Sequence, residues 1–228
     1  CKTPELAAEV TMQPIERFPL DAAIIFADIL LPLEPMGLHL EFAEGEGPLI
    51  DNPLRDAAAV DRLKQIDGSE LQFVMDAISL TRKRLNGRVP LIGFAGAPFT
   101  LASYAIEGGG SRNYIHTKQM MYGEPKVWHA LMDKFSKVLT SYLRCQIEAG
   151  AQAVQLFDSW VGCLSASDYI EYVKPHVRSI FEGLKNAGVP LIHFGTGTAA
   201  ILKDMREAGG NVIGVDWRVP LDEAWRTI

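Results

Sequence analysis

The stretch at residues 90–95 (PLIGFA) decides the fold, because it is short, nearly all apolar and followed at once by Gly96, Ala97 and Pro98. Hydrophobicity is almost continuous along it and does not alternate, which is typical of a strand covered on both faces in a parallel sheet. Four more runs share this character, at residues 22–27 (AAIIFA), 153–157 (AVQLF), 190–194 (PLIHF) and 211–215 (NVIGV). The sequence therefore predicts five buried strands.

Helical patterns separate these strands. The longest begins at Pro125, carries apolar residues every three to five positions and stops at Gly150. Further patterns cover residues 69–85, 169–188 and 198–209, and Pro175 is expected to kink or split the second of these. Strands that alternate with helices predict an α/β protein with a parallel sheet.

Two architectures fit this alternation, a doubly wound open sheet and a (β/α)8 barrel. The first strand runs into Phe26-Ala-Asp-Ile-Leu30 with no glycine-rich phosphate loop, which weakens a nucleotide-binding sheet. A barrel needs eight strands, and five are recognised. Because the chain opens on Cys1 and closes at Ile228 inside a predicted helix, we expect residues 1–228 to be one (β/α)8 barrel domain, truncated at both ends.

Composition narrows the functional class. Of the 228 residues, 48% are apolar and 22% charged, as in an ordinary globular protein. The net charge of −6 gives no basic excess, so nucleic-acid binding is not expected. Three distant cysteines (Cys1, Cys145 and Cys163) without a CxxC motif indicate free thiols in a reducing, cytoplasmic compartment. The absence of an apolar run of about 18 residues predicts no membrane span.

Polar residues follow the predicted strands, at the sheet edge where α/β enzymes place their sites. Asp28 is the strongest candidate, because a lone carboxylate before Ile29, Leu30 and Leu31 is costly unless it is paired or used. The plainer interpretation is helix capping, which we prefer for Thr196, Thr198 and Ser167. The residues after the other strands are Thr100, Tyr104, Asp158, Ser159, Asp216 and Trp217.

Other chemistries have weaker support. The five histidines are scattered without an HExxH motif, and His193, the one in a strand, is expected to be an interior residue and not a metal ligand. Residues 107–111 (EGGGS) predict a flexible loop, and residues 45–48 (GEGP) predict a turn. Ser159 lacks a nucleophile elbow.

In combination, several blocks resemble the uroporphyrinogen decarboxylase family. They lie at residues 26–37 (FADILLPLEPMG), 93–101 (GFAGAPFTL), 107–111 (EGGGS), 157–159 (FDS), 192–195 (IHFG) and 213–217 (IGVDW), with Tyr104 between the second and third. The resemblance runs through the whole chain. It implies a (β/α)8 barrel, a homodimer, and removal of carbon dioxide from the four acetate side chains of uroporphyrinogen III without metal or organic cofactor.

The resemblance also implies roles for individual residues. Asp28 matches the essential aspartate that accepts hydrogen bonds from pyrrole N–H groups, and Tyr104 and Ser159 match substrate-binding residues. The family's arginine-rich N-terminal block and its C-terminal histidine have no counterpart in the chain. We therefore expect the 228 residues to be about two thirds of a domain, and inactive alone.

Two alternatives remain at this point. Zinc-dependent methyltransferases of the same superfamily, which act on corrinoid-bound methyl groups and thiols, carry His-x-Cys where this chain has His193, Phe194 and Gly195, and glycine supplies no thiolate for zinc. A non-catalytic barrel that binds a tetrapyrrole or a partner protein would carry similar polar strand ends.

Overall fold

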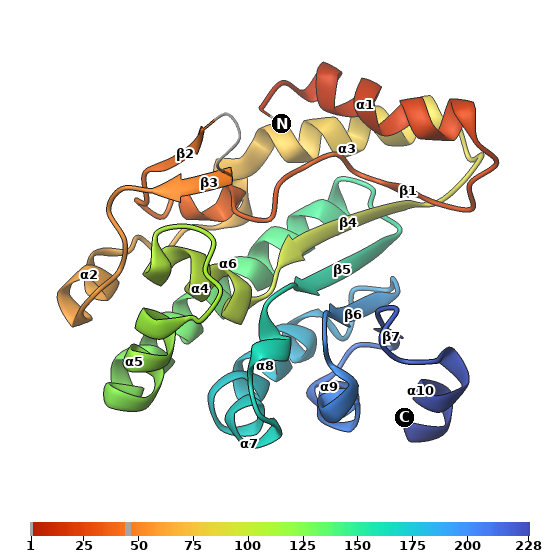
Figure 1. Ribbon diagram of the computed structural model, residues 1–228. Coiled ribbons are helices and arrows are strands. Elements are labelled where there is room, and N and C mark those ends of the chain that lie inside the picture. Colours follow the sequence, from red (N-terminus) through yellow and green to blue (C-terminus); the bar gives the residue numbers. More distant parts are fainter. Residues whose placement is uncertain (1, 44–46) are drawn as a thin grey trace.

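A computed structural model describes residues 2–43 and 47–228. The five predicted strands all form, as β1 (Ala23–Ile24), β4 (Leu91–Gly96), β5 (Ala153–Asp158), β6 (Leu191–Gly195) and β7 (Val212–Gly214). They pair in parallel in the order β1-β4-β5-β6-β7, as Figure 1 shows. This order follows the chain without reversal, as in the wall of a barrel, whereas a doubly wound sheet reverses at a switch point. The doubly wound alternative is therefore wrong.

Helices connect the strands. Those that the sequence predicts are α3 (Gln72–Leu85), α6 (Pro125–Glu148) and α9 (Leu202–Ala208), with α1 (Pro4–Arg17) and α10 (Leu221–Thr227) near the two ends. The sequence patterns did not single out α2 (Ala57–Arg62), α4 (Pro98–Glu107) or α5 (Ile115–Gly123). In Figure 1, α1 lies along α3 at one side of the sheet, and α10 lies at the other.

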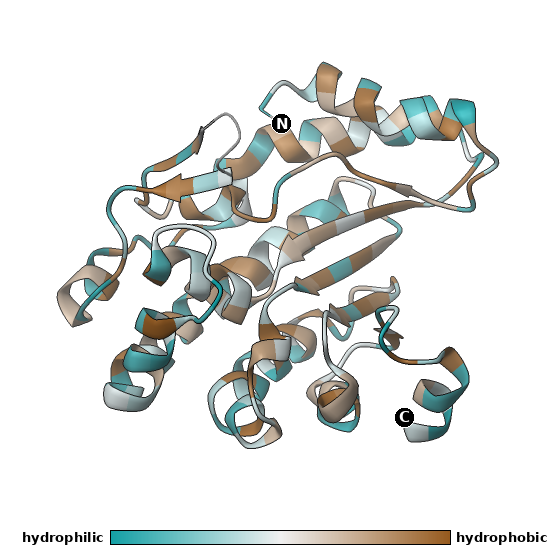
Figure 2. Cartoon of the chain, in the orientation of Figure 1, coloured by the Kyte–Doolittle hydropathy of each residue, from teal (hydrophilic) through white to brown (hydrophobic). Residues whose placement is uncertain are grey.

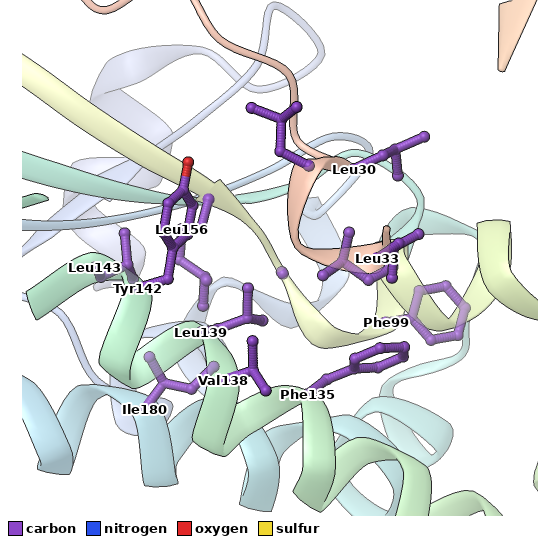
Figure 3. Close-up of a cluster of buried hydrophobic side chains, with 14 of the residues drawn as sticks. Leu30, Leu33, Phe99, Phe135, Val138, Leu139, Tyr142, Leu143, Leu156 and Ile180 are labelled. Carbon is purple, nitrogen blue, oxygen red and sulfur yellow. The ribbon is translucent and has the colours of Figure 1, made fainter. Parts of the chain in front are cut away.

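Helix α6 is the main support of the sheet. Its apolar stripe is fully buried, and Figure 3 shows Phe135, Val138 and Leu139 gathered with Leu33 and Phe99. Complete burial of each such side chain contributes about 1.5–3 kcal/mol. The stripe therefore fixes α6 against the strands that carry the polar residues described below.

The segment around Pro175 is split, as predicted. A short helix α7 (Ala166–Asp168) leads into a π-helical turn over Tyr169–Val173, and α8 (Lys174–Leu184) then begins with Pro175 in its first turn. Because proline cannot donate its backbone N–H, an upstream carbonyl loses its helical partner. The Trp128 indole N–H of α6 donates to the Tyr172 carbonyl at 2.9 Å, so α6 contacts the chain at this turn.

The two faces of the sheet differ in burial. On β4, Leu91, Gly93 and Ala95 are buried against helices, and a Cβ built on Gly93 would lie 2.3 Å from Gln146 Oε1 of α6. The opposite face carries apolar side chains that stay partly exposed, and Figure 2 shows the hydrophobic character of these strands. The sequence predicted strands buried on both faces, and the structure confirms this only for the face that packs against the helices. The partly exposed residues are Ile24, Phe26, Ile92, Phe94, Phe157, Ile192, Phe194 and Val212.

A hairpin of β2 (Leu40–Ala43) and β3 (Gly47–Ile50) interrupts the alternation and was not predicted. Of the turn expected at residues 45–48, residues 45 and 46 lie outside the described residues, and residues 47 and 48 begin β3. Residues 107–111 are not a flexible loop. Gly108 ends α4 with φ of +87° and accepts a hydrogen bond from the Ile50 N–H at 2.9 Å, while Glu107 Oε1 accepts from the Thr117 N–H and hydroxyl, both at 2.9 Å. The glycine segment thus ties α4 to the hairpin.

Two further expectations concern thiols and membranes. Cys145 and Cys163 are free thiols, as the spacing predicted, and Cys1 lies outside the described residues. Among the helices formed by residues 2–43 and 47–228, none is long and apolar enough to span a membrane.

Candidate active site

Asp28 lies just beyond β1, where the chain turns into a short 3-10 helix over Leu31–Leu33. Its Oδ1 accepts the Leu30 N–H at 2.7 Å, so the carboxylate also braces this turn. The side chain is half-buried and lines a cavity of about 370 Å³. Lys2, on the same cavity, pairs with Glu34 at 2.9 Å, and Asp28 has no ion-pair partner within the described residues.

Tyr104 comes from α4, which starts directly after β4 with Pro98 in its first turn. Its ring packs on Trp160 with the centroids 5.9 Å apart. Burial raises the pKa of the Tyr104 hydroxyl, the Trp160 side chain opposes this, and the negative charge of Asp28 raises the pKa further. Tyr104 is therefore a neutral hydrogen-bonding group near neutral pH, close enough to Asp28 to feel its charge.

Ser159 follows β5 and lines a second cavity, of about 300 Å³, together with Tyr114, Thr196 and Arg218. The Thr196 hydroxyl donates to the Ser159 carbonyl, which ties the ends of β5 and β6 together. Thr196 therefore does not cap a helix, contrary to our expectation. Thr198 donates instead to the Gly195 carbonyl at 3.3 Å.

The cap of α7 was also misassigned. Ser165, and not Ser167, accepts the Asp168 N–H at 3.2 Å at the start of this helix.

Asp158, beside Ser159, is completely buried. Its Oδ1 accepts the Thr100 hydroxyl at 2.7 Å, and its Oδ2 has no hydrogen-bond partner in the described part of the chain. Burial raises the pKa of this carboxyl to about 7, although the hydrogen bonds from Thr100 act to lower it. The sequence placed Asp158 at a strand end but gave no sign of its pairing with Thr100, which lies 58 residues earlier.

Asp216, after β7, links the loop that follows β6 to the loop that follows β7. Its Oδ2 accepts the Gly197 N–H at 2.7 Å, its Oδ1 accepts the Arg218 N–H at 3.0 Å, and it pairs with the Arg218 guanidinium. Burial alone would raise the pKa of Asp216, but these donors hold it below its usual value. The guanidinium lies 4.7 Å from the centre of the Trp217 ring, which is exposed.

His193 is an interior residue, as expected. It is buried on the helix side of β6, packs on Phe181 at 5.1 Å and meets the Met205 carbonyl at 3.2 Å. Burial lowers its pKa to about 4. Across the residues that the structure describes, no group of three His, Cys, Asp or Glu side chains is placed to hold a metal ion.

The three residues assigned from the resemblance all lie beyond the ends of neighbouring strands. Asp28 and Ser159 line different cavities. Trp160, on the Ser159 cavity, packs on Tyr104 and on Tyr114, with the centroids 5.9 Å apart in both pairs. Sequence patterns did not indicate this aromatic link.

Comparison with known proteins adds independent information. The family model described as uroporphyrinogen decarboxylase matches residues 1–228. Curated uroporphyrinogen decarboxylases of Sorangium cellulosum and Carboxydothermus hydrogenoformans are 61% and 55% identical, each over 100% of this chain and 65% of the relative. The chain thus spans about 65% of the length of these relatives.

A solved structure, a methyltransferase from Methanosarcina mazei, matches with a TM-score of 0.75 at 19% identity and covers 96% of this chain and 64% of that one. At this identity the likeness shows the fold alone. It agrees with the barrel-type order of the strands.

Proposed function

Because the chain belongs to the uroporphyrinogen decarboxylase family, we propose that the full-length protein removes carbon dioxide from the four acetate side chains of uroporphyrinogen III and releases coproporphyrinogen III. We include in this proposal a single barrel domain to which residues 1–228 contribute. A homodimer and a cytoplasmic location also belong to it, and both rest on family membership. Gel filtration of the full-length protein tests the dimer.

The chemistry requires stabilisation of a cation. An acetate loses carbon dioxide slowly because the electron pair of the broken C–C bond has no acceptor. Protonation of the adjacent pyrrole carbon makes the ring that acceptor: the electron pair enters the ring as carbon dioxide leaves. A second proton then converts the methylene into a methyl group, and the first proton leaves the ring carbon, which restores the pyrrole. A fixed carboxylate beside the positive ring lowers this barrier electrostatically.

The observation that supports the proposal most strongly is the environment of Asp28. It is a half-buried carboxylate at a strand end, oriented by the Leu30 N–H and free of a cationic partner among the described residues. Its carboxylate oxygens remain available to accept charge-assisted hydrogen bonds from the pyrrole N–H groups. A lysine or arginine paired with Asp28 would have removed this support.

Tyr104 and Ser159 would contact the substrate close to Trp160, whose ring packs on Tyr104. The partly exposed face of the sheet supports the same assignment, because Phe26, Phe94 and Phe157 offer an apolar surface to the rings of the macrocycle. Phe94 and Phe157 already pack edge to face at 6.2 Å.

The test is turnover by the full-length protein, followed by mass for four successive losses of carbon dioxide from uroporphyrinogen. We expect Asp28→Ala to lower kcat by roughly 100- to 1000-fold, the usual effect of losing a preorganised charge partner, and Asp28→Glu to retain part of the activity. Asp76→Ala is the matched control, since Asp76 is an exposed carboxylate of α3 bound to Gln72. Full activity in Asp28→Ala would refute the assignment.

A further inference from the structure

Asp158 is a buried acid for which the proposed chemistry gives no role. It has no exposed surface, no positively charged partner within the described residues, and one carboxyl oxygen without a hydrogen bond. A carboxyl group in such surroundings is costly. Such groups concentrate at functional sites, and this one directly precedes Ser159.

A short hydrogen-bonded chain connects Asp158 to Thr100 and Trp160, which neighbour the proposed substrate contacts Tyr104 and Ser159. The Trp160 N–H donates to the Thr100 hydroxyl at 3.3 Å, and that hydroxyl donates to Asp158 Oδ1 at 2.7 Å. Thr100 and Tyr104 lie one helical turn apart on α4, so the position of Thr100 determines that of Tyr104.

The same chain holds the loop after β5. Ser159 lies between Asp158 and Trp160, and the Trp160 ring packs on Tyr104. Asp158 also holds the next strand end, because its carbonyl accepts the Thr196 N–H at 3.2 Å.

We propose that Asp158 is a positioning residue for the decarboxylation, which holds Tyr104 and Ser159 in their relative places through the Thr100 hydroxyl and does so best as a carboxylate. The inference rests on the proposed function. Its physical basis is that a hydroxyl binds a charged acceptor more tightly than a neutral one. Asp158 itself need not touch the substrate.

Among the described titratable residues on which its charge acts, none other than Asp158 has a pKa near neutral. Tyr114, Cys163 and Tyr169 are the titratable residues on which its charge acts. Burial raises the pKa of Cys163 to about 11 and raises the pKa of both tyrosines well above their usual range, so all three stay neutral where Asp158 ionises.

The experiment compares pH profiles of kcat and KM for the full-length wild-type protein and Asp158→Asn. The amide keeps an oxygen for the Thr100 hydroxyl but cannot ionise, so it imitates the protonated acid. We expect wild-type kcat to rise about fivefold through neutral pH, from the difference between a neutral and a charge-assisted hydrogen bond. Asp158→Asn should stay flat at the low-pH rate of the wild type, with KM little changed.

Variants of Thr100 test the same chain without changing the acid. Thr100→Val removes the hydroxyl through which Asp158 acts, so its kcat should lose the step and stay near the low-pH rate of the wild type. Thr100→Ser keeps the hydroxyl and should keep the wild-type step. Thr81→Val is the matched control, because the Thr81 hydroxyl is equally buried but donates to the Ala77 carbonyl within α3.

The outcomes separate the two proposals. A wild-type protein that releases no carbon dioxide refutes the proposed function, and the inference falls with it. An active wild type whose profile has no step near neutral pH, or a folded Asp158→Asn with the wild-type step, refutes the inference alone. If Asp158→Asn does not fold, as judged by circular dichroism, a wild-type step in the kcat profile of Thr100→Val refutes it instead.

Discussion

Replacement of Asp158 by asparagine should stabilise the protein in a pH-dependent way. The pKa of Asp158 rises from the usual 3.8 to about 7 on folding, because burial penalises the charged form. Between these values the folded protein holds a proton that the unfolded chain has lost. Stability from this group is therefore full below about pH 4, falls as the pH rises, and reaches its minimum above about pH 7.

The size of the effect follows from the shift. One pKa unit corresponds to about 1.4 kcal/mol, so a rise from 3.8 to about 7 corresponds to an upper figure of about 4 kcal/mol. Asparagine carries no such penalty. The free energy of unfolding of Asp158→Asn, relative to wild type, should therefore increase by up to about 4 kcal/mol as the pH rises over this range.

Urea unfolding of the full-length wild-type and Asp158→Asn proteins at several pH values measures this difference. Other titrating groups, His193 included, are present in both proteins and cancel in the comparison. Thr81→Val should differ from wild type by an amount that does not change with pH. A constant difference for Asp158→Asn, or one that shrinks as the pH rises, would show that Asp158 is ionised in the folded protein at low pH and would refute the argument from burial.

Two further predictions concern other parts of the fold. Burial lowers the pKa of His193 from 6.5 to about 4, so its contribution to folding stability is full above pH 6.5 and is lost as the pH falls toward 4. His193→Gln should therefore remove up to about 3 kcal/mol of the acid destabilisation in the same urea assay. An unchanged sensitivity to acid would contradict this. Gly108→Ala should lower the free energy of unfolding by about 1–2 kcal/mol for the left-handed backbone, and further because its Cβ would lie 3.2 Å from the Ile50 carbonyl. Gly188→Ala is also left-handed but has nothing within 4 Å of its Cβ, so it should lose only the backbone contribution. Equal losses on thermal unfolding would rule out an effect of the Ile50 contact.

The strands could be predicted because each is a short apolar run between turn signals, and burial of apolar surface dominates their pairing. Helix α4 escaped prediction for the opposite reason. It is buried on nearly every side, so its sequence has no polar stripe from which a helical period could be recognised. The hairpin of β2 and β3 escaped because Phe42 and Leu49 are exposed there, and backbone pairing rather than burial forms it.

The candidate site could be predicted to the level of strand ends but not of contacts. Asp28, Asp158 and Ser159 each follow a strand, which the sequence indicates directly. The pairing of Thr100 with Asp158 depends on how α4 packs over β5, and no local pattern encodes that geometry. The helix caps expected at Thr196 and Thr198 failed for the same reason, since both hydroxyls bind carbonyls at or next to the ends of β5 and β6.

Charge places a last constraint on the proposed function. Uroporphyrinogen carries acetate and propionate groups around its rim, so its binding site must supply cations that are free to meet carboxylates. The cations on the two cavities described here, Lys2 and Arg218, are each engaged, by Glu34 and Asp216 respectively. The described residues that line these cavities and the open face of the sheet thus provide an apolar surface and, at Asp28, a carboxylate without a cationic partner, which suits the centre of the macrocycle and not its rim. We therefore expect the cations that bind the rim to come from the parts of the family fold that this chain, at about 65% of the length of its relatives, does not span.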